Sequence, residues 1–153
     1  MDTLKGYEIA VNRVQHMSER RQVSSQIYLA VNTGIFGVLA FLVKDAGFRG
    51  WPLVAVSLPL FAVGTAACIV WYRIIAEFRD IIGWHYEKLR EIEQSVLDCY
   101  NVCTEEWEEL FKPQDGKTRF GFSRLEAWLP RLFVALYAVY LLGLMAAAVA
   151  GWR

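Results

Sequence analysis

The chain has 153 residues, of which 56% are hydrophobic and 21% charged, and its 16 Lys and Arg balance 16 Asp and Glu. This length allows one domain, and the apolar content excludes an intrinsically disordered chain. Zero formal net charge excludes a uniformly basic surface, so we expect no nucleic-acid partner. The charges are placed very unevenly along the chain.

The first predicted element is an amphipathic helix over residues 1–21. Its apolar side chains recur at steps of three and four, at Leu4, Tyr7, Val11 and Val14.

Three stretches carry no charge: residues 22–43, 50–72 and 132–152. About 20 helical residues cross a hydrocarbon core, so these stretches predict transmembrane helices at 22–43, 50–72 and 127–152. Three buried helices of a soluble bundle are the alternative, but the second and third stretches lack the polar face that such helices need. The fold class expected is therefore an all-α integral membrane protein with three transmembrane helices and long cytoplasmic helical extensions.

Residues 44–51 connect the first two spans in a tight hairpin, and the second span runs on into a cytoplasmic helix over residues 73–112. We expect one continuous helix from about Pro52 to Phe111, because Gly83 is the only Pro or Gly between the second span and Pro113. Apolar residues at steps of three and four predict a coiled-coil seam that packs antiparallel against residues 1–21. The seam comprises Phe78, Ile82, His85, Leu89, Ile92 and Val96, and continues to Cys99 and Cys103.

The segment Glu105-Glu-Trp-Glu-Glu109 is acidic and precedes a linker over residues 113–126. Such a run is either a solvated helix face or a docking surface for a basic cytoplasmic protein partner.

A polar stripe marks the first span, since its amides and hydroxyls cluster on one side of the helix. Such groups either hydrogen-bond to neighbouring helices or line a wet pore. The stripe comprises Gln22, Ser25, Gln26, Asn32 and Thr33. The third span has small residues at four-residue steps, at Gly143, Ala147 and Gly151, which is typical of close helix packing. Both features favour a cyclic homo-oligomer.

We expect that the protein binds no cofactor, has no metal site and is not an enzyme. Cys99 and Cys103 could offer two thiolates to a metal, but no local pair completes a four-ligand site. Arg79 and His85 match the loose Arg-x(4–6)-His pattern of HEPN ribonucleases, which makes them weak catalytic candidates. A packed or hydrogen-bonded histidine is the simpler interpretation of His85, because it occupies a seam position.

Several short motifs occur in a recognisable order: Arg20-Arg21 before Asn32-Thr33, then Trp71-Tyr72-Arg73, Phe78-Arg79-Asp80, Glu106-Trp107, Leu125-Glu126, Pro130, Phe133 and Tyr137. This order resembles the RipA family of small octameric bacterial membrane proteins. The resemblance implies a ring with a central opening and a cytoplasmic vestibule. Members of that family often end the juxtamembrane helix with a Leu-Pro pair, whereas Leu97 is followed here by Asp98. Similar small membrane proteins act as effectors in bacterial defence, some as octameric accessories of RNA-targeting CRISPR systems.

The leading hypothesis is a ring in the bacterial inner membrane that forms or gates a pore, as a membrane-perturbing defence effector. The alternatives are a membrane-anchored scaffold that recruits a cytoplasmic partner and a membrane-tethered HEPN-like ribonuclease.

The distribution of positive charge predicts the topology. Thirteen Lys and Arg lie in residues 1–21 and 73–131, against three in residues 44–51 and at Arg153, which places the amino terminus in the cytoplasm and the carboxyl terminus outside. A periplasm-dependent reporter fused after Arg153 should be active, and one inserted near Gln114 inactive. The reverse pattern would overturn the orientation.

Overall fold

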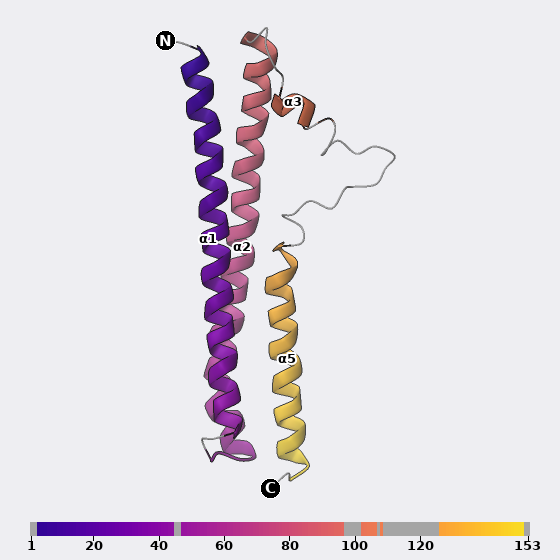
Figure 1. Ribbon diagram of the computed structural model, residues 1–153. Coiled ribbons are helices and arrows are strands. Elements are labelled where there is room, and N and C mark those ends of the chain that lie inside the picture. The colour runs from indigo at the N-terminus through magenta and orange to yellow at the C-terminus, as the bar shows by residue number, and fades with distance from the viewer. Residues whose placement is uncertain (1–2, 45–46, 97–101, 107, 109–125, 152–153) are drawn as a thin grey trace. The chain divides into compact units, whose positions relative to one another are not determined.

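The computed structural model describes residues 3–44, 47–96, 102–106, 108 and 126–151. Its helices are α1 (Thr3–Lys44), α2 (Trp51–Val96), α3 (Val102–Glu106) and α5 (Trp128–Val149), as Figure 1 shows. By length and composition α1, α2 and α5 can each cross a membrane. The described chain is therefore all-helical, with three candidate membrane spans.

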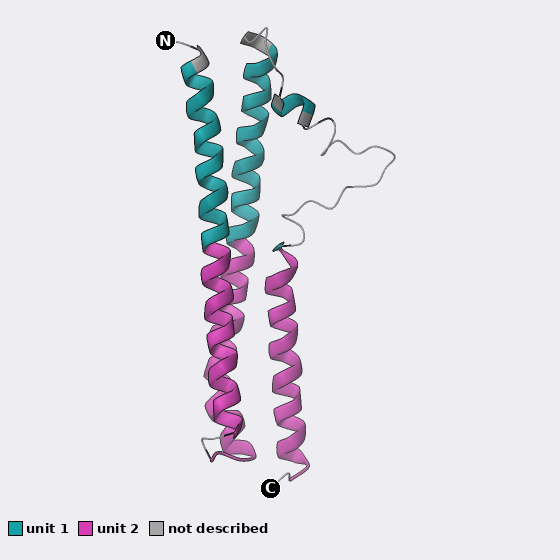
Figure 2. Ribbon diagram, in the orientation of Figure 1, with its two compact units in different colours: residues 1–23, 74–126 teal, residues 24–73, 127–153 magenta. Residues whose placement is uncertain are grey.

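The chain divides into two compact units (Figure 2). Unit 1 comprises Met1–Val23 and Ile74–Glu126, and unit 2 comprises Ser24–Arg73 and Ala127–Arg153. The division falls within a few residues of the charge boundaries in the sequence, so unit 2 holds nearly all of the uncharged stretches.

In unit 2, α1 and α2 form a hairpin whose connection depends on glycine. Gly47 and Gly50 have φ angles of 71° and 60°, a left-handed conformation that only glycine adopts without steric cost. Proline is placed where it costs little, since Pro52 and Pro130 occupy the first turns of α2 and α5, where backbone N–H groups lack helical partners. Pro59 lies inside α2, as is tolerated in membrane helices.

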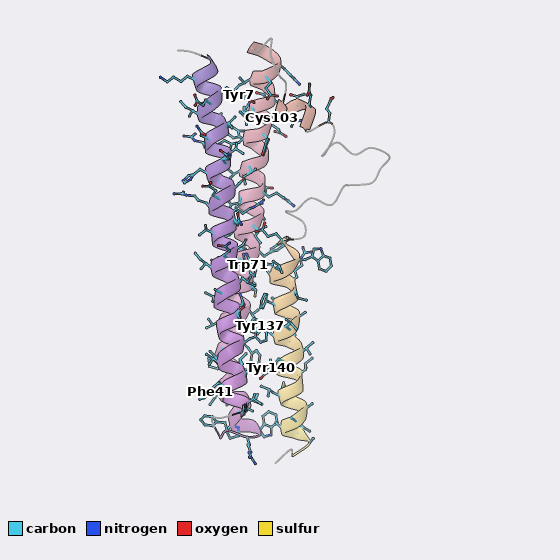
Figure 3. All side chains as sticks on the ribbon, in the orientation of Figure 1. Tyr7, Phe41, Trp71, Cys103, Tyr137 and Tyr140 are labelled. Atoms are coloured by element: carbon cyan, nitrogen blue, oxygen red, sulfur yellow. The ribbon has the colours of Figure 1, made fainter. Side chains whose placement is uncertain are left out.

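The core of unit 2 is built around Tyr137 of α5, which is 2% exposed. Phe36 of α1 stacks on its ring at a centroid distance of 4.6 Å, and Phe61 of α2 meets it edge-on at 6.1 Å. Both geometries are favourable for aromatic pairs. Tyr137 therefore contacts side chains from both other helices of the unit, and in Figure 3 it lies between α5 and the overlapping ribbons of α1 and α2.

Gly64 of α2 makes room for this tyrosine. A Cβ atom at this position would lie 2.6 Å from the Tyr137 hydroxyl oxygen, well inside van der Waals contact. The absence of a side chain at Gly64 thus lets α2 and α5 approach closely, as small residues commonly do in membrane bundles.

In unit 1, the first part of α1 packs against the last part of α2. The Tyr7 hydroxyl donates a hydrogen bond of 2.6 Å to the Glu93 carboxylate. Val14, Ile75 and Leu89 are also buried in this unit. The first part of α1 and the last part of α2 therefore contact each other at Tyr7 and Glu93.

The expectation of one helix from Pro52 to Phe111 is wrong. α2 ends at Val96, and the separate helix α3 begins at Val102. The Glu93 carboxylate accepts hydrogen bonds from the backbone N–H groups of Cys103 and Thr104. In one continuous helix Glu93 and Cys103 would be about 15 Å apart along the axis, so α2 and α3 are not parts of one continuous helix.

We predict that Gly64→Ala destabilises the protein by about 1–3 kcal/mol, because the added methyl group overlaps Tyr137. Gly83→Ala in the same helix is the matched control, since a Cβ there meets no described atom within 4 Å. The control should be neutral or slightly stabilising, because alanine favours helix. Reversible unfolding in mixed detergent micelles measures both, and equal effects of the two variants would contradict the close approach.

Candidate functional site

The polar stripe predicted on the first span divides into two groups in the structure. The buried group centres on Asn32, which is 0% exposed. Its Oδ1 atom accepts hydrogen bonds from the Tyr137 hydroxyl at 2.9 Å and from the Cys68 thiol at 3.2 Å, and its Nδ2 donates to the Tyr28 carbonyl at 2.8 Å. One amide thus joins α1, α2 and α5.

Ser25 belongs to the same side of α1. Its hydroxyl oxygen accepts a hydrogen bond of 3.3 Å from the Trp71 indole N–H, and the Trp71 ring stacks on Tyr28 at 6.0 Å. Trp71 is 0% exposed, and a buried indole N–H generally needs such a hydrogen-bond partner.

The exposed group of the stripe consists of Gln22, Gln26 and Thr33. Thr33 bonds to the Leu29 carbonyl of its own helix at 2.8 Å. At about 100° per residue, Gln26 and Thr33 lie within about 60° of the small residues Gly37 and Ala40, all of them exposed. We call Gln26, Thr33, Gly37 and Ala40 the open face of α1. Asn32 and Ser25 lie about 100° from its centre.

The small residues predicted for close packing in the third span make no such approach in the described subunit. A Cβ atom at Gly143 meets nothing within 4 Å, Ala147 is half-buried, and Gly151 follows the end of α5 with a φ of 64°. Their role against another helix stays a prediction. Gly64, which the sequence analysis missed, is the glycine at the close approach. The only feature of the sequence that could have indicated this close approach is the presence of a glycine inside an apolar span.

The described residues of the predicted seam all lie in unit 1 and differ in burial. Leu89 is buried, the side chain of Val96 lies outside the described residues, and so does Cys99. The other described seam residues are half-buried: Phe78, Ile82, His85, Ile92 and Cys103.

Glu93 follows Ile92 in the sequence and is 1% exposed. The sequence analysis did not predict that this charged residue is buried. Its signal was its position four residues after Leu89, on the same face of the helix.

The Glu93 carboxylate organises unit 1. Besides Tyr7 and the two backbone N–H groups of α3, the Thr104 hydroxyl donates to it at 2.9 Å. Burial acts to raise the pKa of Glu93 and these hydrogen bonds act to lower it, with a net pKa below the ordinary value. The carboxylate therefore stays charged at neutral pH, and its contribution to stability is lost only as the pH falls through that lowered pKa.

Burial and the bond to Glu93 raise the pKa of Tyr7 above its ordinary value, so its hydroxyl remains a donor. In α3 the carboxylate meets the first turn, where backbone N–H groups lack helical partners and favour negative charge.

The weak catalytic candidates do not converge within the described residues. Arg79 and His85 are six residues apart on α2, so their side chains point about 120° apart. His85 Nδ1 contacts the Ile81 carbonyl at 2.8 Å, and the Arg79 guanidinium lies 3.5 Å from Asp80. Of the acidic segment, Glu105 and Glu108 are exposed, and Trp107 and Glu109 lie outside the described residues.

We predict that Glu93→Ala releases α3. The change leaves the N–H groups of Cys103 and Thr104 without their charged acceptor, and one such bond contributes about 1.5–3 kcal/mol, equivalent to a tenfold or greater change in local opening. Amide hydrogen exchange over residues 102–106 should accelerate by that factor. Glu91→Ala is the control, because Glu91 is exposed and pairs with Lys88. Unchanged exchange in Glu93→Ala would show that the carboxylate does not hold α3.

Comparison with protein families gives one match. The model of the octameric membrane protein family (8xMP) matches residues 4–146, which include nearly all of both units. Comparisons with curated proteins and with solved structures found no match. The match agrees with the three apolar helices and with the resemblance found in the sequence. The chain therefore belongs to the octameric membrane protein family.

Proposed function

We propose that eight copies of this chain form a ring in the bacterial inner membrane, with the amino terminus in the cytoplasm, and that the ring forms or gates a pore. The observation that carries the proposal is the open face of α1, where Gln26 and Thr33 are exposed within an uncharged span. The proposal assigns the chain no enzymatic activity.

Hydrocarbon cannot hydrogen-bond to a side-chain amide, so Gln26 needs water or another protein copy beside it. Asn32, in contrast, has its acceptor and donor groups engaged inside the subunit. A closed ring brings the same face of every subunit to the axis, where the Gln26 amides would meet water. Gly37 and Ala40 on that face leave room along the axis because they carry little or no side chain.

The main alternative is a scaffold with a closed centre. There the open face would pack against a neighbouring copy, and the exposed carboxylates of Glu105 and Glu108 would recruit a basic partner. The defence role implied by the resemblance belongs to the pore proposal, because an effector of this kind would act by letting ions cross the membrane.

We predict that Gln26→Leu leaves the octamer intact and reduces ion flux through reconstituted vesicles several-fold, because a ring of leucines dewets a narrow passage. Val31→Leu is the matched control. Val31 is also exposed but lies about 140° away around α1, so the change should alter neither quantity.

Particle size and ion flux are measured on the same preparation of each variant. Loss of the octamer in Gln26→Leu would place the open face between copies and favour the scaffold. An assembled wild type that conducts no ions would reject the pore outright.

A further inference from the structure

A groove of about 400 Å³ lies between α2 and α5 in unit 2. Its wall is formed by Cys68 and Ile69 of α2 and by Pro130 and Val134 of α5. Binding sites for small molecules commonly fall in this range of volume and are mostly apolar.

The groove has a basic, aromatic rim at one end of the spans. Arg73 is the first charged residue after the uncharged stretch 50–72, and Arg131 is the last before the uncharged stretch 132–152. Both arginines line the groove together with Tyr72. Charges at these boundaries lie at the level of the lipid headgroups, where basic pockets between membrane helices attract anionic lipids.

The Arg131 guanidinium is held in place by aromatic groups. Its Nη2 donates a hydrogen bond of 3.0 Å to the Tyr72 hydroxyl, and its central carbon lies 5.0 Å from the centroid of the Tyr72 ring and 5.9 Å from that of Trp128. The bond to Tyr72 uses one of the five N–H donors that a guanidinium carries. An arginine fixed in this way is suited to bind a phosphate oxygen pair at low entropic cost.

We propose that this groove binds one anionic phospholipid per subunit. The phosphate contacts Arg131 and Arg73, and the first part of an acyl chain lies along Ile69 and Val134. The combination of positive charge with an apolar wall favours a lipid over a free phosphate, because a free phosphate gains nothing from Ile69 and Val134. The inference does not depend on the pore.

The test uses the full chain, purified in a zwitterionic detergent and titrated separately with phosphatidylglycerol, phosphatidylcholine and inorganic phosphate. Native mass spectrometry counts the bound molecules. We expect one phosphatidylglycerol per subunit, retained more tightly than phosphatidylcholine, and no displacement by inorganic phosphate. Displacement by phosphate alone would identify an anion site and overturn the lipid proposal.

Two variants and a control locate the site. Arg131→Gln should weaken phosphatidylglycerol binding about tenfold or more, the loss expected for one charge-assisted contact. Ile69→Trp should do the same with every charge kept, because Ile69 is 52% exposed and a larger ring fills the groove. Arg49→Gln removes an exposed charge at the other end of the spans and should leave binding unchanged.

Equal losses in Arg131→Gln and Arg49→Gln would mean a general charge effect and reject the groove. A change of particle size in Arg131→Gln, with lipid retention unaltered, would mean that a neighbouring copy fills the groove and would also overturn the proposal.

Discussion

The amide of Asn32 is the interaction on which unit 2 depends, because it is the point where three helices are joined by hydrogen bonds. Its oxygen accepts from Tyr137 and from Cys68, and its nitrogen donates to the α1 backbone. Helices in a membrane gain little from burying apolar surface against one another, so packing and hydrogen bonds determine how they associate. Gly64 supports the arrangement by giving Tyr137 the space to reach Asn32.

This constraint separates the two sides of α1. Asn32 and Ser25 are used inside the subunit, which leaves Gln26 and Thr33 on the open face. The single polar stripe of the sequence thus has two edges with different roles. Asn32 and Ser25 on one edge hydrogen-bond inside the subunit, whereas Gln26 and Thr33 on the other edge are exposed and can contact another copy or water. The proposed pore rests on the second edge, and the proposed lipid site uses neither.

The sequence was sufficient to predict three helices long and apolar enough to cross a membrane. The reason is that bilayer thickness determines how long an uncharged helical stretch must be. The sequence was insufficient for the end of α2 at Val96 and for the separate helix α3, because it has no proline or glycine between them. Glu93 binds the first turn of α3 there. Its position four residues after Leu89 places it on the buried face, but a search for apolar seam residues leaves a charged residue out.

Asn32 and Ser25 lie only about 100° around α1 from the centre of the open face. The sequence alone therefore does not show which polar residues of the stripe are buried and which are exposed. Tyr137 and Gly64 lie 73 residues apart, and the space that one gives the other exists only after folding.

The most direct measurement is a double-mutant cycle between Asn32→Leu and Tyr137→Phe. The free energy of unfolding of each variant is measured by reversible unfolding, at a detergent concentration at which the subunits are monomeric. The account predicts a coupling free energy of about 0.6–1.7 kcal/mol, the range found for hydrogen bonds between membrane helices. A parallel cycle between Thr33→Val and Tyr137→Phe should give no coupling beyond about 0.5 kcal/mol, because Thr33 lies on the open face. Additive effects of Asn32→Leu and Tyr137→Phe would contradict the central role of this amide.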